Sequence, residues 1–511
     1  MVETLGELIE RNEVYYRDNV AFVMGPQRLT YAAYADRVRR LASALFRLGV
    51  RRQDRVGILS TNRIEYFEAY GVCEWAGYIL TLYNFRLAPP EYVWLFEDSA
   101  PSVVIFEAQY ADIVDSLRAR FPSVAHYICV GGPPPEWAHS YEALISSGDP
   151  TGPPLRARAN DYCYLYYTSG STGRPKGVPC TQTAALGLAR YNGRLLGAGM
   201  RVLQITPAYH TGGKGSPLGA LWLAGTVVLQ RSFDALKFLE VVQEERVSFT
   251  FMVAAMIQAV IDHPRFGEFD VSSLRQIMSA SAPIPVPLLK RAMEAFGPIF
   301  FIAYGATETG TICQLDQHEL RPSGTPEEIT RLGSVGHVIP EEEGAILDEE
   351  GLECIPGEVG EICFKSPIFD GYWNNSVATL EATRGGWFHT GDLGYADEEG
   401  YVFLVDRKKD VIISGGENIY SREVEDAIYR HPAVLEVGVI GIPDDKWGEV
   451  VKAVVVLRAA QRITKVDLDA FCGTQIARYK CPKHIDFVSE LPHLGNGKLD
   501  KVSLRKQHRP A

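Results

Sequence analysis

Hydrophobic positions in the first half of the chain alternate between helical and strand-like spacing. Between Thr30 and Gly49, apolar residues recur every three or four positions, as on one face of an amphipathic helix. Thr30 is placed to cap the first turn of this helix and Gly49 to end it. The run 55–60 then predicts a short buried strand, Asn62 a second cap and 64–78 a second helix. Strands that alternate with helices predict mostly parallel sheets with helices on their faces.

The pattern changes near Gly333, where short β-rich runs are separated by turns that contain glycine. These runs predict a smaller β subdomain. After Asp406 come a strand, a Gly-Gly turn, a helix with apolar Val424 and Ile428, and another strand. This second part predicts a compact α+β unit that continues to the C-terminus.

Composition narrows the class of protein. At 511 residues the chain is too long for one compact core, which predicts two to four domains or subdomains. The 46% hydrophobic and 22% charged residues are typical of a soluble globular protein. A net charge of −12 argues against a nucleic-acid partner, which would need a basic surface.

Targeting signals and metal motifs are not evident. The longest strongly apolar run, 219–229, is far shorter than the roughly 20 residues that span a bilayer, so no transmembrane segment is expected. The first residues lack the pattern of a signal peptide. Nine cysteines without a C-x-x-C pair predict reduced thiols in a cytoplasmic protein and no structural zinc.

The segment YYTSGSTGRPKG, residues 166–177, is the first candidate for chemistry. Its Pro175 and Gly177 do not fit a P-loop, which needs G-x-x-x-x-G-K-[ST] leading directly into a helix. A hairpin loop that closes over a polyphosphate fits better, and an exposed Gly/Ser turn is the structural alternative. The residues of this loop that would contact phosphate are Thr168, Ser169, Gly170, Ser171, Thr172, Gly173 and Lys176.

This loop resembles the signature loop of the adenylate-forming superfamily, which comprises acyl-CoA and aryl-CoA synthetases, peptide-synthetase adenylation domains and firefly luciferase. Further superfamily motifs follow in the same order: PAYHTGG (207–213), SASAP (279–283), YGATETG (304–310), WFHTGDLG (387–394), DRKKDVIISGGENIY (406–420) and NGKLDK (496–501). The resemblance covers nearly the whole chain. It implies an α/β protein with a large N-terminal AMP-binding domain, residues 1–408, of two α/β subdomains plus a β subdomain. A small mobile α+β domain, residues 409–511, would follow.

The resemblance implies a reaction in two steps. A carboxylate attacks the α-phosphate of ATP to give an acyl-adenylate and pyrophosphate, and a thiol, usually that of coenzyme A, then displaces AMP. Because the first step brings two anions together, the site has to supply positive charge. The implied enzyme is an acid–thiol ligase, a CoA ligase for a fatty or other carboxylic acid. Its implied ligands are ATP, Mg²⁺, coenzyme A and the acid.

Three alternatives stay open at this point. The acceptor thiol could belong to a carrier protein, although no carrier or condensation domain is recognisable in the sequence. A luciferase-type monooxygenase shares the motifs, but no feature supports it. A non-catalytic acyl- or nucleotide-binding regulator is the third, and intact Lys176, Thr307, Glu308 and Lys498 argue against it. A homodimer and the identity of the acid are equally open.

The resemblance also assigns the ATP site. Lys498 would reach from the C-terminal domain to the substrate carboxylate and the α-phosphate. Thr307 would bind the α-phosphate, and Glu308, with Thr168, would bind Mg²⁺. Asp392 would accept both ribose hydroxyls, and Arg407 would make a second ribose or phosphate contact. The adenine slot would consist of Ser281, Ala282, Pro283 and Tyr304, and the nucleotide site would also include Gly305 and Ala306. Taken singly, each of these residues has a structural alternative, such as a cap, a core position or a surface ion pair.

The remaining assignments concern the hinge, the thiol and the acid. Lys409 would be the hinge of the C-terminal domain, and Ser414, Gly415 and Gly416 would line a CoA tunnel, although a tight turn explains the same glycines. His210 would act as a gate beside the acid. The acyl pocket would include Tyr209, His210, Thr211, Gly212, Lys214, Met252 and Gly305.

Lys214 suggests a specific hypothesis about the acid. A buried cation beside an acyl tunnel is costly unless it is paired, so Lys214 could indicate a polar or carboxylate-bearing acyl group. The alternative is that Lys214 points to solvent or pairs with a nearby acidic residue.

Overall fold

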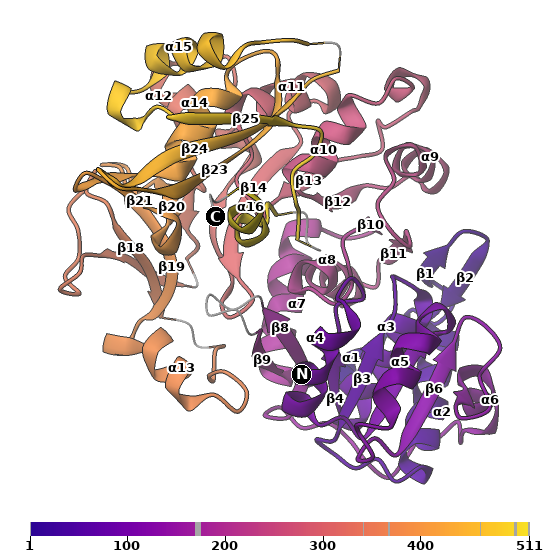
Figure 1. Ribbon diagram of the computed structural model, residues 1–511. Helices are drawn as coiled ribbons and strands as arrows, with labels where there is room; N and C mark the ends of the chain where they lie inside the picture. Colours follow the sequence, from indigo (N-terminus) through magenta and orange to yellow (C-terminus); the bar gives the residue numbers. More distant parts are fainter. Residues whose placement is uncertain are drawn as a thin grey trace.

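The computed structural model describes residues 2–168, 175–340, 342–365, 368–459, 461–494 and 498–508. Within these residues the strands form four sheets (Figure 1). Five residues of the predicted phosphate loop, Ser169, Gly170, Ser171, Thr172 and Gly173, lie outside the described part of the chain.

The first sheet has seven strands in the order β7-β6-β5-β3-β4-β8-β9. Its neighbouring strands are parallel, except for the antiparallel pair β8 and β9, which flanks the phosphate loop. The strands are β3 (Arg55–Leu59), β4 (Ile79–Leu82), β5 (Val103–Glu107), β6 (His126–Val130), β7 (His139–Ser140), β8 (Tyr162–Thr168) and β9 (Lys176–Thr181). The helices of this region are α1 (Leu5–Tyr15), α2 (Tyr31–Arg47), α3 (Ile64–Ala76), α4 (Pro89–Ser99), α5 (Ala111–Arg118) and α6 (Tyr141–Ser147). The predicted parallel sheet with intervening helices is confirmed.

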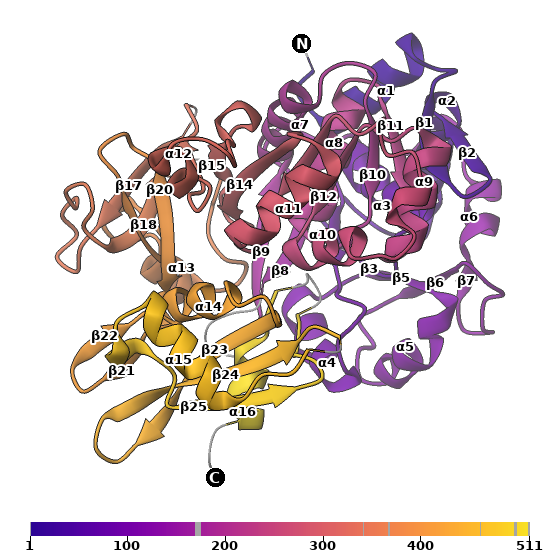
Figure 2. The same ribbon diagram turned by 90° about the horizontal axis from the view of Figure 1, so that it is seen from above.

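The second sheet has nine strands in the order β16-β15-β14-β13-β12-β10-β11-β1-β2. The strands are β1 (Val20–Met24), β2 (Gln27–Thr30), β10 (Arg201–Gln204), β11 (Thr226–Leu229), β12 (Phe249–Met252), β13 (Gln276–Ser279), β14 (Phe300–Ala306), β15 (Gly310–Leu315) and β16 (His337–Val338). The helices are α7 (Gln182–Leu196), α8 (Thr211–Trp222), α9 (Ala235–Glu245), α10 (Ala254–Ile261) and α11 (Val286–Phe296). Helices α9, α10 and α11 lie side by side along this sheet (Figure 2). Strand β1 pairs in parallel with β11, so the beginning of the chain completes the second sheet and not the first.

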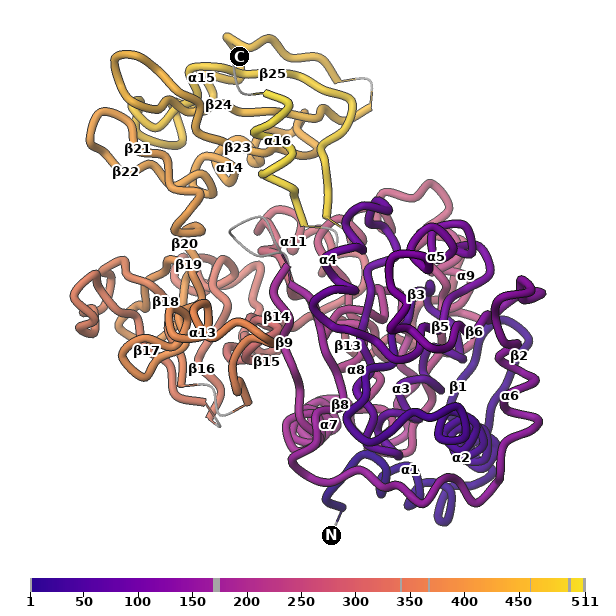
Figure 3. Tube along the Cα trace, turned by 60° about the horizontal axis from the view of Figure 1, so that its bottom comes forward, coloured from indigo at the N-terminus to yellow at the C-terminus, as the bar shows by residue number. Residues whose placement is uncertain are grey.

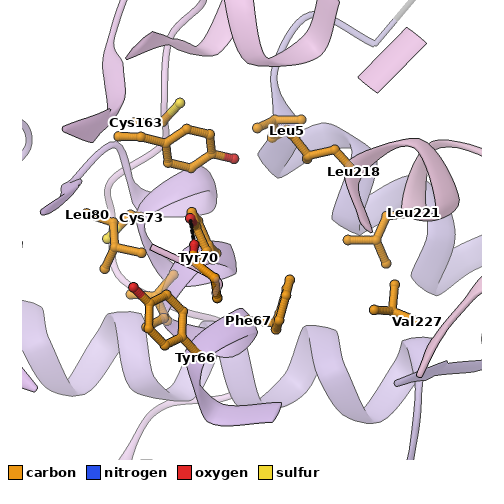
Figure 4. Close-up of a cluster of buried hydrophobic side chains, with 14 of the residues drawn as sticks. Leu5, Tyr66, Phe67, Tyr70, Cys73, Leu80, Cys163, Leu218, Leu221 and Val227 are labelled. Atoms are coloured by element: carbon orange, nitrogen blue, oxygen red, sulfur yellow. Dashed lines mark hydrogen bonds between the residues drawn. The ribbon is translucent and has the colours of Figure 1, made fainter. Parts of the chain in front are cut away.

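Both α/β sheets share one hydrophobic core. Figure 4 shows Tyr66, Phe67 and Tyr70 of α3 in one hydrophobic cluster with Cys163 of β8 and Leu218 of α8. These side chains are almost completely removed from water. Each Å² of apolar surface that is removed from water stabilises the folded state by about 25 cal/mol. The shared core therefore holds the two sheets against each other.

Asn62 is also part of this junction, and its prediction as a helix cap is wrong. Helix α3 starts after Arg63, which makes no side-chain cap. The buried Asn62 amide instead donates to the carbonyl groups of Thr206 (2.9 Å) and Gln230 (3.1 Å), and its oxygen accepts from the Ala208 N–H (2.8 Å). Since buried polar groups need partners, these long-range bonds outweigh a local cap and hold the start of the 207–213 motif against the first sheet.

The third sheet is antiparallel, in the order β17-β18-β19-β20, and confirms the predicted β subdomain. Its strands are β17 (Glu343–Leu347), β18 (Gly360–Lys365), β19 (Phe388–Ala396) and β20 (Val402–Arg407), and the helices of this region are α12 (Pro326–Arg331) and α13 (Ser376–Ala382). After β20, a short 3₁₀ helix η5 (Lys408–Asp410) leads to the rest of the chain. The predicted domain boundary falls within η5.

The fourth sheet belongs to the C-terminal unit, which we define as the elements from β21 to α16. Its strand order is β22-β21-β24-β23, with β25 paired to β24. The elements are β21 (Ile412–Ser414), β22 (Glu417–Ile419), α14 (Ser421–Tyr429), β23 (Val434–Asp444), β24 (Gly448–Leu457), α15 (Lys465–Gln475), β25 (His484–Val488) and α16 (Lys501–His508). Figure 3 shows this unit as a lobe connected through β20. None of the helices in the described ranges has both the length and the apolar character needed to cross a membrane.

Candidate active site

Lys498 of the C-terminal unit lies in a half-buried, charged environment contributed by the rest of the chain. The Leu494 N–H donates to the carbonyl of Lys498 (2.7 Å), which fixes its backbone just before α16. Burial and then Arg407 lower the pKa of Lys498 to about 8, whereas the carboxylates of Asp392 and Glu308 oppose this shift. The predicted catalytic lysine is therefore close enough to interact electrostatically with Arg407, Asp392 and Glu308, which are all predicted to belong to the ATP site.

Asp392 and Arg407 face each other on the neighbouring antiparallel strands β19 and β20. The Arg407 Nε atom forms an ion pair with Oδ1 of Asp392. The hydroxyl group of Tyr304 donates to the other carboxylate oxygen, Oδ2, over 2.8 Å. Both oxygens of the predicted ribose acceptor are thus oriented by residues that the sequence also places in the nucleotide site.

The predicted adenine residues lie at the ends of adjacent parallel strands. Tyr304 and Gly305 are near the end of β14, and the 279–283 motif begins at the last residue of β13, where Ser279 is paired with Ile302. Ser281 has a positive φ of 70°. A Cβ atom on Gly305 would lie 1.8 Å from the carbonyl oxygen of Gly310, so only glycine fits there. Ligand sites in α/β proteins commonly occupy this edge of the sheet.

Glu308 lies with Thr307 in the turn between β14 and β15 and is buried. Its Oε1 atom accepts a hydrogen bond of 2.9 Å from the Tyr372 hydroxyl. The ammonium of Lys176 lies 4.6 Å from the centre of the Tyr372 ring. Burial raises the pKa of Glu308, while the bond from Tyr372 and the charges of Arg407 and Lys176 lower it. Tyr372 thus contacts both Glu308, which is predicted to bind the metal, and Lys176, which is predicted to bind the phosphates.

The donor chemistry around Glu308 fits magnesium. Mg²⁺ takes oxygen ligands and commonly uses one or two carboxylates together with phosphate oxygens. In the described ranges, no three His, Cys, Asp or Glu side chains converge to hold a metal on their own. The ion would therefore depend on Glu308 and on phosphate oxygens of the nucleotide. Thr168, the other residue predicted to bind the metal, pairs with Lys176 at the end of the β8–β9 hairpin. The Thr168 hydroxyl lies 3.5 Å from the carbonyl oxygen of Lys176.

His210 precedes α8, and its Nε2 atom is buried without a hydrogen-bond partner among the residues that the structure describes. Burial, followed by the charges of Lys498 and Arg86, lowers the pKa of His210 to about 3. The imidazole is therefore neutral at physiological pH. An uncharged ring beside Lys498 can contact an acyl group without competing for its carboxylate.

Aromatic side chains surround the predicted acyl pocket. The ring of Tyr209 lies 4.3 Å from that of His210 and 5.5 Å, edge on, from that of Phe85. A Cβ atom on Gly212 would approach the Phe251 ring to 2.8 Å. Thr211 begins α8. Aromatic rings thus lie beside His210 and against Gly212 at the start of α8.

Met252 does not line this region. Phe251 and Met252 are consecutive on β12 and lie in two different hydrophobic clusters. Met252 belongs to the cluster that contains Leu239, Ile257 and other residues of α9, α10 and α11. Side chains alternate across a strand, so the position next to a pocket residue faces the other side of the sheet.

Lys214 is buried and already paired. Its Nζ atom is 2.7 Å from Oε1 of Glu74, and the two side chains are 0% and 2% exposed. The Tyr164 hydroxyl donates to the same oxygen over 2.5 Å, and the Tyr70 ring centre lies 4.1 Å from Nζ. Pairing with an acidic residue, the alternative left open by the sequence, is what the structure shows. The hypothesis of a carboxylate-bearing acyl group thereby loses its physical basis.

Lys409 is exposed at the centre of η5, between two anchored aspartates. Asp406 accepts a hydrogen bond from the Ser421 hydroxyl (2.7 Å), and Asp410 accepts one from Arg505 (2.7 Å). Asp406 belongs to β20, so its bond to Ser421 crosses the predicted domain boundary and would have to break if the C-terminal unit rotated about Lys409. Asp410, in contrast, is bonded within the C-terminal unit. The exposed position of Lys409 is compatible with the predicted hinge.

The glycines predicted for the CoA tunnel form the exposed turn between β21 and β22, next to Ser414. Gly415 and Gly416 have positive φ angles of 62° and 90°. The Gly415 N–H donates to the Trp447 carbonyl (2.8 Å), and a Cβ atom on Gly415 would lie 2.6 Å from the Trp447 ring. Turn geometry is sufficient to explain both glycines, and their role toward CoA stays a prediction.

Sequence reasoning missed Tyr372. It follows Gly371 outside the superfamily motifs that were recognised, and its spacing gives no sign of a site. Only the two contacts with Glu308 and Lys176 reveal it.

The comparisons with known proteins agree with this geometry. Residues 9–373 match the family model described as AMP-binding enzyme, and residues 423–498 match the AMP-binding enzyme C-terminal domain. A feruloyl-CoA synthase of Amycolatopsis sp is 38% identical over 496 residues, 94% of each chain. The long-chain-fatty-acid–CoA ligase FadD13 of Mycobacterium tuberculosis is 34% identical over 496 residues, covering 94% of this chain and 93% of that protein.

A solved structure also covers almost the whole chain. The anthranilate CoA ligase AuaEII in complex with anthranoyl-AMP superposes with a TM-score of 0.91 at 26% identity, covering 99% of this chain and 97% of that one. The family models, the motifs and the site geometry lead to the same assignment. This chain belongs to the AMP-binding enzyme family, among the acid–thiol ligases of the adenylate-forming superfamily.

Proposed function

We propose that the protein is an ATP- and Mg²⁺-dependent carboxylic acid–CoA ligase that acts through an acyl-adenylate and releases AMP and pyrophosphate. The observation that carries this proposal is the position of Lys498. It comes from the C-terminal unit, yet it is partly buried and interacts electrostatically with Asp392, Glu308 and His210 of the preceding domain. A partly buried ammonium at this point opposes the repulsion between a carboxylate and the α-phosphate.

The other site residues have complementary tasks in this proposal. Asp392, oriented by Tyr304 and Arg407, binds the ribose hydroxyls and fixes the nucleotide. Lys176 binds the terminal phosphates, and Glu308 holds Mg²⁺, which when bound neutralises phosphate charge. Lys498 then aligns the acid with the α-phosphate, so that positioning and charge provide most of the catalysis.

For the second step we propose that residues 409–511 rotate as a mobile domain about Lys409. The rotation would withdraw Lys498 and present the turn at Ser414 to the thiol of CoA. A carrier-protein thiol is the competing acceptor. A reducing, cytoplasmic location is consistent with all nine cysteines being free thiols.

We further propose an aromatic carboxylic acid as substrate. Tyr209 lies beside His210 and Phe85 beside Tyr209. Phe251 lies against Gly212, and the neutral His210 adds no charge. A planar ring packs against such side chains better than a flexible chain does, because it loses less conformational freedom on binding. Feruloyl-CoA synthase and the anthranilate CoA ligase act on aromatic acids by name, whereas the name of FadD13 indicates long chains.

One assay tests these proposals together. The protein is incubated with ATP, Mg²⁺ and a panel of benzoic, cinnamic and straight-chain fatty acids. The acceptor is CoA, an acyl carrier protein or none, and AMP and thioester are measured. We expect thioester and AMP in the presence of CoA, at least tenfold faster for an aromatic acid. AMP formation that needs a carrier protein would reject CoA as the acceptor, and a preference for fatty acids would reject the aromatic substrate.

A variant separates the two half-reactions. Lys498→Ala should lose adenylation by a factor of 100 or more, while CoA transfer from supplied acyl-adenylate should change less than tenfold. Equal loss in both half-reactions would contradict the proposed withdrawal of Lys498.

A further inference from the structure

Tyr372 connects three segments that are distant in sequence. Its hydroxyl group donates to Oε1 of Glu308 over 2.9 Å, in the turn after β14. Its ring lies below the ammonium of Lys176, the first residue of β9, at 4.6 Å from Nζ to the ring centre. One side chain therefore contacts both the residue proposed for Mg²⁺ and the residue proposed for the terminal phosphates.

The backbone around Tyr372 is fixed on both sides. Gly371 has a φ of 118°, which favours glycine, and the Tyr372 N–H donates to the Thr379 hydroxyl of α13 (2.9 Å). The Trp373 N–H donates to the carbonyl of Gly177 (2.8 Å). The residue after Tyr372 is thus bonded to the residue after Lys176, so the two backbones are held together and the ring stays within reach of the ammonium.

The two contacts use different parts of the tyrosine. A phenol hydroxyl that donates to a carboxylate makes a charge-assisted hydrogen bond, which orients the acceptor. The face of the ring carries partial negative charge and attracts a cation. A partner that orients a metal-binding carboxylate in this way commonly matters 10- to 100-fold for metal affinity.

We propose that Tyr372 is a positioning residue that directs the Glu308 carboxylate toward Mg²⁺ and the Lys176 ammonium toward the terminal phosphates of ATP. This inference rests on the proposed function. Tyr372 itself touches neither the acid nor the α-phosphate in this role. Its loss changes the arrangement of the two residues that do the binding.

The chain offers a closely matched control. Tyr401 also donates its hydroxyl to a carboxylate, Oε1 of Glu319, over 2.9 Å, and carries the Arg331 guanidinium 4.7 Å from its ring centre. It precedes β20 and takes no part in the candidate site. Tyr401→Phe therefore removes the same kind of hydroxyl at a distance from the nucleotide.

The test measures ATP binding by titration calorimetry, without acid or CoA, at a series of Mg²⁺ concentrations and in EDTA. Tyr372→Phe keeps the ring and loses the hydroxyl, so the Mg²⁺ concentration that gives half-maximal enhancement of ATP binding should rise roughly tenfold. Its affinity for ATP in EDTA should stay within about twofold of wild type. Tyr372→Leu also loses the ring, and its affinity in EDTA should fall about two- to tenfold. Tyr401→Phe should match wild type in both measurements.

The outcomes distinguish this inference from the proposed function. If Tyr372→Phe shows the wild-type dependence on Mg²⁺, the positioning role is overturned while the proposed function stands. If wild-type protein binds no ATP, the proposed function itself fails. Thermal unfolding of each variant checks that it is folded, and the mild Tyr372→Phe change decides the question even if Tyr372→Leu is unstable.

Discussion

Lys498 is the residue whose charge most directly limits the proposed chemistry. Its pKa of about 8 means that the ammonium is mostly protonated at pH 7 and mostly neutral at pH 9. Since only the charged form opposes the repulsion between the acid and ATP, kcat/KM for ATP should fall as pH rises above about 8, by up to tenfold per unit. Pyrophosphate release measured from pH 6 to 10 tests this expectation.

Lys498→Arg is the matched variant, because a guanidinium stays charged over this range. It should lower the rate and flatten the fall above pH 8. A fall of the same steepness in Lys498→Arg would show that another group titrates.

The buried pair of Lys214 and Glu74 gives a prediction about stability. Removing one member leaves an unpaired buried charge, which typically costs about 3–5 kcal/mol. Lys214→Met alone should therefore lower the free energy of unfolding in urea by roughly that amount. The double variant Lys214→Met, Glu74→Gln should recover most of the loss, and the preference among acids should not change.

Single residues also show where prediction from sequence succeeds. Lys498, Asp392 and Arg407 were identified from ordered motifs, and the structure brings them together. Met252 was assigned to the wrong face of its strand, and the sequence left the pairing of Lys214 open, because their side-chain surroundings depend on strand alternation and on a partner far away in sequence. Tyr372 was missed since its importance lies in contacts and not in a motif.

At the level of elements, local patterns predicted the helices and strands well. The Thr30 hydroxyl caps α2, accepting from the Ala33 N–H over 3.2 Å, and Gly49 follows the helix with a φ of 96°. Asn62 failed as a cap because it bonds to the second sheet instead. The pairing of β1 with β11 was equally beyond local reasoning, since no short-range signal specifies a partner 200 residues away.

The β8–β9 hairpin supports a prediction about Gly177. A Cβ atom there would lie 2.9 Å from the Cβ atom of Trp373, so Gly177→Ala should push the 371–373 segment away from β9. We expect adenylation to fall roughly tenfold, with ATP affinity as the parameter that changes, because phosphate-binding geometry tolerates little displacement. Pyrophosphate release at varied ATP concentration measures this.

Gly187→Ala is the control for the same substitution. Gly187 lies in α7, and nothing in the described structure is within 4 Å of the added Cβ atom. This variant should keep full activity and gain a few tenths of a kcal/mol in stability, up to about 1 kcal/mol. An equally impaired Gly187→Ala would contradict the explanation by steric contact.

At the scale of the whole molecule, an ion pair joins the C-terminal unit to the second sheet. Arg458, directly after β24, lies 3.4 Å from Asp262, which follows α10 and also pairs with Arg291 of α11. The proposed rotation would separate Arg458 from Asp262. Both groups are about one-third exposed, so the contact contributes at most about 1 kcal/mol.

Arg458→Ala should therefore shift the balance between the two half-reactions by about two- to fivefold in favour of CoA transfer. Adenylation and transfer are measured separately, at low salt and at 0.5 M salt, where screening should abolish the difference. Arg462→Ala removes the same charge from an exposed position nearby and should leave the balance unchanged. A shift of equal size in Arg462→Ala would point to net charge instead of the ion pair.

The position of β1 and β2 at the edge of the second sheet has a practical consequence for protein engineering. The segment 20–30 belongs structurally with β11, although the first α/β sheet intervenes in the sequence. A chimera that exchanges only a continuous block around 182–340 with a homologous enzyme would combine β1 and β2 of one protein with the remaining strands of this sheet from the other. Transplanting residues 20–30 together with this block should give the better-folded hybrid. Deletion of β1 and β2 should disrupt the second sheet, whose strand β12 contains Phe251 and whose strand β10 leads to Tyr209, both in the predicted acyl region.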